Sequence, residues 1–213
     1  MMQNKPKLAI IGAGGHGKVV AETAALMGCW QEIVFLDDRA GTLREVVGFP
    51  VVAGWDALGD TVLADEYDIA VAIGNNAARE HITDQVAALG FALPAIIHPS
   101  AIISRSAKIG AGCMILAAAV IQADVYIGRG CIVNTAAAVD HDCLLEDFSH
   151  ICPGVRLAGN TLVGQLSWVG IGACTRQNLR IGREVVVGAG SVVVRDIADG
   201  VKVAGVPAKP LLR

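Results

Sequence analysis

From residue 97 onward, aliphatic side chains recur at every sixth position. The series is Ile97, Ile103, Ile109, Ile115, Ile121, Ile127, Val133, Val139, Leu145, Ile151, Leu157, Val163, Val169, Thr175, Ile181, Val187 and Val193. Four residues after these positions, from Ala107 to Ala173, comes a second set that is mostly small. A six-residue period fits neither an α-helix nor a straight alternating strand. It predicts a solenoid in which each hexad forms one short strand and one turn.

This repeat resembles the left-handed parallel β-helix of hexapeptide-repeat acyltransferases, in which three hexads make one triangular coil. The resemblance implies five to six coils between Ile97 and Ala198, followed by a short tail from Gly200 to Arg213. The left hand comes from the resemblance alone, because parallel crossovers in general favour the opposite hand. Thr175 is the one interior position that is not aliphatic. It allows three interpretations: a looser wall, a bulge or a ligand contact.

The first 96 residues have a different pattern, in which buried strands alternate with helices. We predict strands at 7–12, 33–36, 51–52 and 68–74, and helices at 18–28, 55–67 and 77–89. This alternation predicts an α/β, Rossmann-like half domain with a small parallel sheet. We therefore expect a nucleotide-sugar-binding domain at 1–96 and a left-handed β-helix acetyltransferase domain at 97–213. The hinge between them contains His98 and Pro99, and we interpret His98 as structural.

Composition narrows the class of protein. The chain has 213 residues, of which 54% are hydrophobic and 17% are charged. No apolar run is long enough to span a bilayer, and the opening run is too short for a secretory signal, so we expect a cytoplasmic protein. Cysteines are scattered without a C-x-x-C pair, which favours buried thiols over disulfides or metal ligands. No dense basic run is present, which argues against nucleic-acid binding. The second half carries a mild positive charge that suits coenzyme A.

The first predicted strand leads into the loop GAGGHG, Gly12–Gly17. Glycines at such a position let the backbone approach a phosphate at a helix N-terminus, and the acids Asp37 and Asp38 lie about 20 residues on. The α/β region has the length of only one mononucleotide-binding half, and His16 adds a side-chain donor. We therefore favour a nucleoside diphosphate sugar over a structural glycine turn, with NAD third.

The stretch from Val133 to Gly159 holds the candidate chemistry. At three hexads per coil, residues 18 apart stack at a strand separation of ~4.8 Å, which places Gly159 one coil from His141. An imidazole beside a backbone N–H suits a general base next to an oxyanion donor. Either Asp140 or Asp142 could orient the ring. We prefer Asp142, although neighbouring strand residues normally point to opposite faces.

The combined motifs resemble the bacterial UDP-amino-sugar N-acetyltransferases of bacillosamine-type protein glycosylation, over essentially the whole chain. The motifs are the loop Gly12–Gly17, Leu36–Asp38, Asn134–Cys143, Asp147–Gly154, Leu157–Gly159 and Gly205–Lys209. The resemblance implies a homotrimer with active sites at subunit interfaces, acetyl-CoA as co-substrate and no metal. It implies catalytic roles for His141, Asp142 and Asn134, with Gly159 as oxyanion donor. Acetyl-CoA would contact His150, Gly159, Ile171, Ala189 and Lys209. The UDP-amino-sugar would contact Gly14, Gly15, His16, Asp37 and Asp38.

The implied reaction is direct transfer of the acetyl group to the 4-amino group of an amino-dideoxy sugar. His141 would take the amine proton, Gly159 would stabilise the tetrahedral oxyanion, and the CoA thiolate would leave. Two alternatives remain open: a sugar O-acetyltransferase of the sialic-acid type, which also uses a histidine base, and a non-catalytic binding solenoid. A zinc hydratase would need about three convergent histidines, and beyond the hinge residue His98 the repeat holds only His141 and His150.

Overall fold

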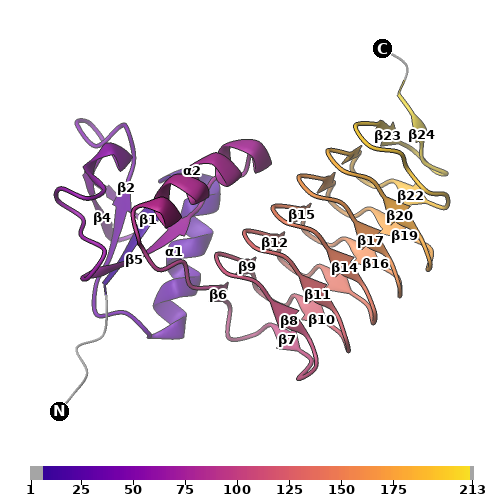
Figure 1. Ribbon diagram of the computed structural model, residues 1–213, viewed down its shortest axis with the longest axis horizontal. Coiled ribbons are helices and arrows are strands. Elements are labelled where there is room, and N and C mark those ends of the chain that lie inside the picture. Colours follow the sequence, from indigo (N-terminus) through magenta and orange to yellow (C-terminus); the bar gives the residue numbers. More distant parts are fainter. Residues whose placement is uncertain (1–6, 212–213) are drawn as a thin grey trace. The chain divides into compact units, whose positions relative to one another are not determined.

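The computed structural model describes residues 7–211, and the chain divides into two compact units, Met1–Pro99 and Ser100–Arg213 (Figure 1). The first unit contains a five-stranded sheet in the order β3-β4-β2-β1-β5. Its elements are β1 (Lys7–Ile11), α1 (Gly15–Met27), β2 (Ile33–Leu36), β3 (Glu45–Val46), β4 (Phe49–Ala53), η1 (Trp55–Ala57), β5 (Tyr67–Val71) and α2 (Asn76–Ala88). All pairings are parallel except the antiparallel β3–β4 pair.

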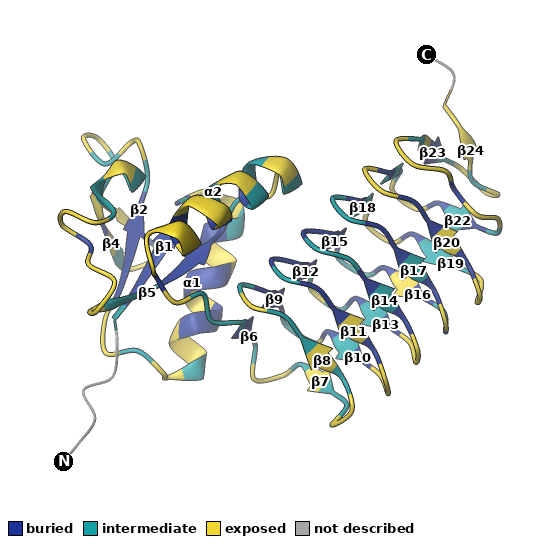
Figure 2. Cartoon of the chain, in the orientation of Figure 1, coloured by how far each residue is buried: buried dark blue, intermediate teal, exposed yellow. Residues whose placement is uncertain are grey.

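The central strands of this sheet are continuous apolar runs because both of their faces are covered. Every residue of β2 is buried, as are four of the five residues of β1 (Figure 2). Ile11, Leu36 and Val71 join Val86 of α2 in one apolar cluster. The prediction of a Rossmann-like half domain is confirmed, and its parallel strands end in the loops that carry the candidate ligand residues.

The second unit is a parallel β-solenoid built from two-residue strands at six-residue steps. Strand β6 (Ile96–Ile97) belongs to the first unit. From β7 to β22 the strands of the second unit are Ile102–Ile103, Lys108–Ile109, Met114–Ile115, Val120–Ile121, Tyr126–Ile127, Ile132–Val133, Ala138–Val139, Leu144–Leu145, His150–Ile151, Arg156–Leu157, Leu162–Val163, Trp168–Val169, Cys174–Thr175, Arg180–Ile181, Val186–Val187 and Val192–Val193. Each strand from β7 to β19 pairs with the strand 18 residues on, as in the register of Ala138 with Arg156. Three sheets result, and the predicted left-handed β-helix with three hexads per coil is confirmed.

The walls of the β-helix are therefore three parallel sheets. Wall one holds β7, β10, β13, β16, β19 and β22; wall two holds β8, β11, β14, β17 and β20; wall three holds β9, β12, β15, β18 and β21. The repeating aliphatics fill the space between the walls, and Ile115, Val133 and Leu145 are completely buried. Burial of each such side chain is worth about 1.5–3 kcal/mol, so the solenoid is stabilised along its whole length.

The turns share one backbone conformation. Every sixth residue from Gly112 to Gly190 adopts a positive φ. Five of these positions are glycine; the other nine are Ala118, Asp124, Ala136, Asp142, Phe148, Asn160, Leu166, Asn178 and Glu184. Left-handed conformations are costly for residues with a side chain, about 1–2 kcal/mol each, so the stacked coils must supply that energy. This position includes Asp142, beside the candidate base.

Three predictions about the elements were inaccurate. The helix expected at 55–67 is only the 3₁₀ turn η1, because Gly59 takes a positive φ of 89° and donates its N–H to Val62 O. Helix α1 begins at Gly15, within the glycine loop, and not at residue 18. The strand at 51–52 is longer and forms a hairpin with β3 through Val47 and Gly48, which both have positive φ.

The tail after the repeat is also more regular than expected. It leaves the six-residue period as predicted, but it forms β23 (Lys202–Ala204) and β24 (Lys209–Pro210). Strand β23 continues wall three by pairing with β21 in parallel, and β24 pairs with β23 in the antiparallel direction. Within residues 7–211, neither helix has the length and apolar character needed to cross a membrane.

Candidate active site

His141 lies at the turn that follows wall one, next to an aspartate that holds its ring. Its Nδ1 is 2.7 Å from Oδ2 of Asp142. Adjacent residues of an extended strand point to opposite faces, but Asp142 occupies the left-handed turn position with a φ of 60°. The turn therefore brings the two side chains together. Asp140 has a different role, because its Oδ1 accepts the backbone N–H of His141 at 2.9 Å.

The pairing determines which ring nitrogen is available for chemistry. A carboxylate accepts a hydrogen bond, so Nδ1 of His141 carries the proton that is donated to Asp142, and Nε2 of the neutral ring keeps its lone pair. The hydrogen bond that His141 donates to Asp142 and the negative charge of Asp140 raise the pKa of His141 above its usual value. Both side chains are exposed, at 60% and 58%. The geometry is that of an oriented, accessible general base.

Gly159 lies directly against the ring of His141. A β-carbon on this glycine would stand 2.6 Å from Cε1 and 2.7 Å from Nε2 of the imidazole, so only glycine fits beneath the ring. The next residue, Asn160, donates its backbone N–H to the carbonyl of His141 at 2.9 Å. Among the described residues, the N–H of Gly159 has no hydrogen-bond acceptor. The 18-residue register thus places a free donor beside Nε2.

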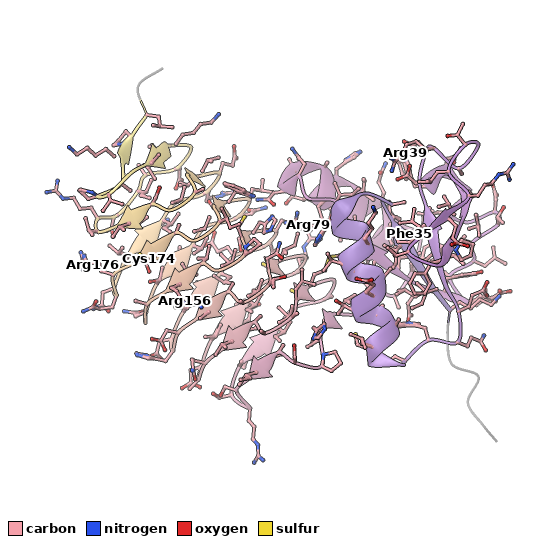
Figure 3. The ribbon with its side chains drawn as sticks, turned by 180° about the vertical axis from the view of Figure 1, so that it is seen from behind. Phe35, Arg39, Arg79, Arg156, Cys174 and Arg176 are labelled. Carbon is pink, nitrogen blue, oxygen red and sulfur yellow. The ribbon has the colours of Figure 1, made fainter. Side chains whose placement is uncertain are left out.

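A groove of about 310 Å³ runs along the outer face of wall one, next to this turn. It is lined by Val120, Gln122, Ala138, Asp140, Arg156, Leu157, Ala158 and Thr175. Arg156 of β16 lies on this wall, with its register partner Cys174 on the next coil (Figure 3). Its guanidinium donates to the carbonyls of Ala136 and Val155. A polar ligand could therefore reach His141 along a face that carries charges of both signs.

His150 occupies a different part of the β-helix. It lies in β15 on wall three, between its register partners Ile132 and Trp168. Its ring meets the indole of Trp168 edge to face, with the ring centroids 6.4 Å apart. Asn134 holds Nε2 of His150 at 3.1 Å through its Nδ2. Because Oδ1 of Asn134 accepts the N–H of Thr135, the amide presents its donor to His150. Neutral His150 then carries its proton on Nδ1.

The predicted residues thus separate into two groups within one chain. His141, Asp142 and Gly159 gather at the turn between walls one and two. The second group lies on wall three or at its turns: Asn134, His150, Ile171, Ala189 and Lys209. Ile171 and Ala189 are stacked 18 residues apart, and the neighbouring Gly190 donates to Ile171 O at 2.8 Å. Within one chain Asn134 contacts His150 across one coil, so its predicted support of His141 stays a prediction.

The glycine loop of the first unit has two kinds of glycine. A β-carbon at Gly17 would come within 2.0 Å of Gly12 O, so Gly17 is required where α1 packs against the end of β1. Gly14 and Gly15 are exposed and have nothing within 4 Å of the added atom. Gly14 is the N-cap of α1, and no side chain caps it. The backbone here is therefore open to an anion at a helix N-terminus.

His16 and the two acids lie around this loop but differ in function. Burial, with the charge of Arg79, lowers the pKa of His16 to about 4, so it is neutral at pH 7. Asp37 already accepts the N–H of Ala13 at 2.8 Å and binds Arg39 in bidentate fashion. Asp38 is exposed. Asp37 therefore has a structural task, and Asp38 has more freedom to contact a ligand.

Asp37, Asp38 and Arg39 border a groove of about 350 Å³ at the carboxyl ends of β1 and β2. Its lining is mostly apolar: Ile11, Gly12, Leu36, Asp37, Asp38, Arg39, Trp55, Ile73 and Ile82. Sequence analysis did not identify Arg39 or Trp55, although Arg39 directly follows the acid pair. Arg79, also labelled in Figure 3, was missed too; it is buried and donates to Ile73 O and Asn76 Oδ1. The sequence signal for Arg79 was its position near the start of α2, shortly after a strand and a glycine.

Among residues 7–211, no three His, Cys, Asp or Glu side chains come together in a way that could hold a metal ion. Burial raises the pKa of the Cys152 thiol to about 12. The described site therefore consists of acid–base groups and backbone donors.

Comparisons with known proteins find similar sugar acetyltransferases. Residues 7–86 match the family model "PglD N-terminal domain". The acetyltransferase domain of PglB from Neisseria gonorrhoeae FA1090, solved in complex with acetyl coenzyme A, is 56% identical with a TM-score of 0.94, covering 98% of this chain and 100% of that one. PerB from Caulobacter crescentus, in complex with CoA and GDP-perosamine, is 40% identical with a TM-score of 0.88, covering 96% and 97%.

A curated relative from Bacillus subtilis (strain 168), UDP-N-acetylbacillosamine N-acetyltransferase, is 38% identical over 113 residues. This match spans 52% of the chain and about half, 51%, of that relative.

Proposed function

The chain belongs to the bacillosamine-type acetyltransferases of the hexapeptide-repeat superfamily, and from this premise we propose that it acetylates the 4-amino group of a UDP-linked amino-dideoxy sugar. Acetyl-CoA is the donor, in keeping with the acetyl-CoA complex of the PglB domain. The observation that carries the proposal is the stacking of Gly159 against the oriented ring of His141. A substrate pair of this kind also fits the predicted cytoplasmic location.

The chemistry follows from the free Nε2. The neutral sugar amine attacks the thioester carbonyl carbon, and Nε2 of His141 accepts the proton that the nitrogen loses. Asp142 stabilises the resulting imidazolium through Nδ1. The C–S bond of the tetrahedral intermediate then breaks, and the CoA thiolate takes up the proton from His141. The products are an amide and a free thiol, and no covalent enzyme intermediate is needed.

The oxyanion of the intermediate requires a donor that is already in place. The N–H of Gly159 is next to the base and free of other acceptors. One such donor is typically worth about 2.7–4 kcal/mol of transition-state stabilisation. The absence of a β-carbon at residue 159 allows the close approach of ring and backbone on which this role depends.

The separation of the two residue groups supports an active site built from two chains. The base lies at the turn after wall one, whereas Asn134 and His150 lie on wall three. We propose a closed, cyclic homotrimer in which the His141 turn of one copy faces wall three of the next. In this arrangement acetyl-CoA extends along wall three towards Lys209, with His150 near the acetyl end.

The first unit is proposed to hold the nucleotide part of the sugar substrate. The open backbone at Gly14 and Gly15 suits a diphosphate, and neutral His16 can donate to it. The apolar groove that contains Trp55 suits a flat base, with Asp38 at its rim. PerB was solved with GDP-perosamine, so the preference for UDP is inferred from the Bacillus subtilis relative, which is named UDP-N-acetylbacillosamine N-acetyltransferase.

The test is release of CoA thiol, measured with acetyl-CoA and a panel of nucleotide sugars. UDP- and GDP-linked 4-amino sugars and their 4-hydroxy counterparts make up the panel. Turnover with the UDP-linked amine, and none with the hydroxy sugar, supports the proposal. Turnover only with the hydroxy sugars would replace it with O-acetylation, and binding without turnover would indicate a non-catalytic solenoid.

A further inference from the structure

The Ala158–Gly159 peptide is held by side chains of the β-helix interior. In a planar trans peptide, the carbonyl of residue 158 and the N–H of residue 159 point in opposite directions. Whatever holds the oxygen of Ala158 therefore also aims the N–H of Gly159. This is the proposed oxyanion donor, so the inference rests on the proposed function.

Two side chains donate to Ala158 O from inside the β-helix. Oγ1 of Thr161 is 2.6 Å from this oxygen, and Sγ of Cys143 is 3.4 Å from it. Thr161 and Cys143 are each 1% exposed. Burial raises the pKa of the Cys143 thiol, which keeps it protonated and able to donate. The carbonyl is thus fixed by donors that solvent cannot replace.

Thr175 completes the arrangement from the next coil. One coil earlier, the backbone N–H of Asp140 bonds to the carbonyl of Leu157 at 3.0 Å. The equivalent N–H of Ala158 donates instead to the hydroxyl oxygen of Thr175, also at 3.0 Å. The ladder between β16 and β19 accordingly retains only the pairing of Arg156 with Cys174. The single polar residue in the interior series is therefore bonded to the Leu157–Ala158 peptide, which precedes the one beside His141.

The hydrogen bonds form a closed ring. The N–H of Ala158 donates to Thr175, and Thr161 donates to Ala158 O, which can only accept. The hydroxyls of Thr175 and Thr161 are 3.4 Å apart, and since the proton of Thr161 is engaged, Thr175 is the donor between them. Hydrogen bonds in such chains strengthen one another. Accepting at the carbonyl also polarises the amide and makes the N–H of Gly159 a stronger donor.

We propose that Thr161 and Thr175 are positioning residues that aim and polarise the Gly159 N–H for the oxyanion of acetyl transfer. Neither touches the substrate in this role. Their effect should appear in turnover and not in binding, because the oxyanion exists only after attack. It should also leave the ionisation of His141 unchanged.

The experiment compares Thr161→Val and Thr175→Val with Thr161→Ser, using CoA thiol release by the 213-residue protein. Valine keeps the shape and removes the hydroxyl. At position 175 it restores the aliphatic type found in the other interior slots, so this variant is expected to fold. We expect kcat to fall about tenfold in both valine variants. Both KM values and the pH of the acid limb should stay at the wild-type level, and Thr161→Ser should recover most of the loss.

The matched control is Ser167→Ala, which removes another buried hydroxyl of the same repeat slot. Ser167 donates to Gly182 O at 2.6 Å, away from the His141 turn. It should lower the melting temperature but keep kcat within about twofold. If wild type is active and Thr175→Val melts normally with unchanged kcat, the inference is wrong and the proposed function stands. If wild type releases no thiol, the proposed function itself fails.

Discussion

The imidazole of His141 and the α-carbon of Gly159 are packed so closely that no side chain fits between them. The hypothetical β-carbon would lie within 2.7 Å of Nε2, well inside normal contact distance. The 18-residue step from one coil of the β-helix to the next therefore fixes the distance between the proposed base and the proposed backbone donor.

Gly159→Ala tests this contact. The clashing atoms belong to an exposed ring that can rotate, so we expect a loss of less than about 1 kcal/mol in unfolding free energy. Moving the ring should lower kcat about 10²-fold. In a His141→Ala background the added methyl meets no ring, so the second substitution should cost almost nothing in either measurement. Equal costs in the two backgrounds, from denaturation and turnover data, would show that Gly159 acts independently of His141.

The pH dependence of turnover should report the His141–Asp142 pair. Asp142 and Asp140 raise the pKa of His141, and a base must be deprotonated to act. The acid limb of kcat/KM is therefore expected above the unperturbed value of about 6.5. Asp142→Asn removes the negative partner, so the limb should move to lower pH while the plateau falls. Asp140→Asn, which leaves the ring bond in place, should move it less. A limb that stays fixed in Asp142→Asn would assign the ionisation to another group.

The contacts between neighbouring coils of this site were predictable from sequence. With six residues per hexad and three hexads per coil, residues that are 18 apart lie one above the other. Gly159 was placed beside His141 in this way. The choice between Asp140 and Asp142 could not be made from alternation, since a strand places neighbouring side chains on opposite faces. Five glycines at the same repeat position as Asp142 were the overlooked sign that residue 142 lies in a left-handed turn.

The contacts outside this stacking were harder to predict. Asn134 was assigned to His141 by resemblance, and the contact with His150 that it makes within one chain was not predicted, although Asn134 lies two residues beyond Ile132, whose register partner is His150. The polar slot at Thr175 was visible in the sequence, but its partner is a backbone N–H, and no side-chain pattern reports that. Arg39 pairs with Asp37 in a loop, where no period applies.

Asn134→Ala should resemble loss of His150 and not loss of His141. Its amide fixes Nε2 of His150 at 3.1 Å, and His150 is predicted to contact acetyl-CoA. We expect a rise in KM for acetyl-CoA of about fivefold to tenfold, with a smaller effect on kcat and none on the acid limb. Steady-state kinetics with each substrate varied in turn would show this. A loss confined to kcat would indicate that Asn134 supports the base His141 and not the binding of acetyl-CoA.

The acid pair in the first unit should divide into a structural and a ligand-binding residue. Asp37→Asn weakens the bonds to Arg39 and to Ala13 N–H, so unfolding should become easier by about 1–2 kcal/mol. Asp38→Asn is the matched control: it should keep the melting temperature and raise KM for the nucleotide sugar. Arg39 also holds the pKa of Asp37 well below its usual range. The contribution of the Asp37 carboxylate to the free energy of unfolding is therefore present above about pH 3.9 and is lost as the pH falls further.

Two defective variants should restore each other if the active site is shared between chains. His141→Ala removes the proposed base at the turn between walls one and two. His150→Ala removes the imidazole on wall three that is predicted to contact acetyl-CoA. In a cyclic trimer each site would take His141 from one copy and His150 from its neighbour. Random mixing of equal amounts then makes about a quarter of the sites complete.

The variants would be mixed under conditions that exchange subunits and assayed at acetyl-CoA concentrations below KM. Activity well above the mean of the separate variants is expected, and mixing His141→Ala with itself is the control. No gain after verified exchange would place both histidines of each site in one chain and would overturn the shared-site proposal.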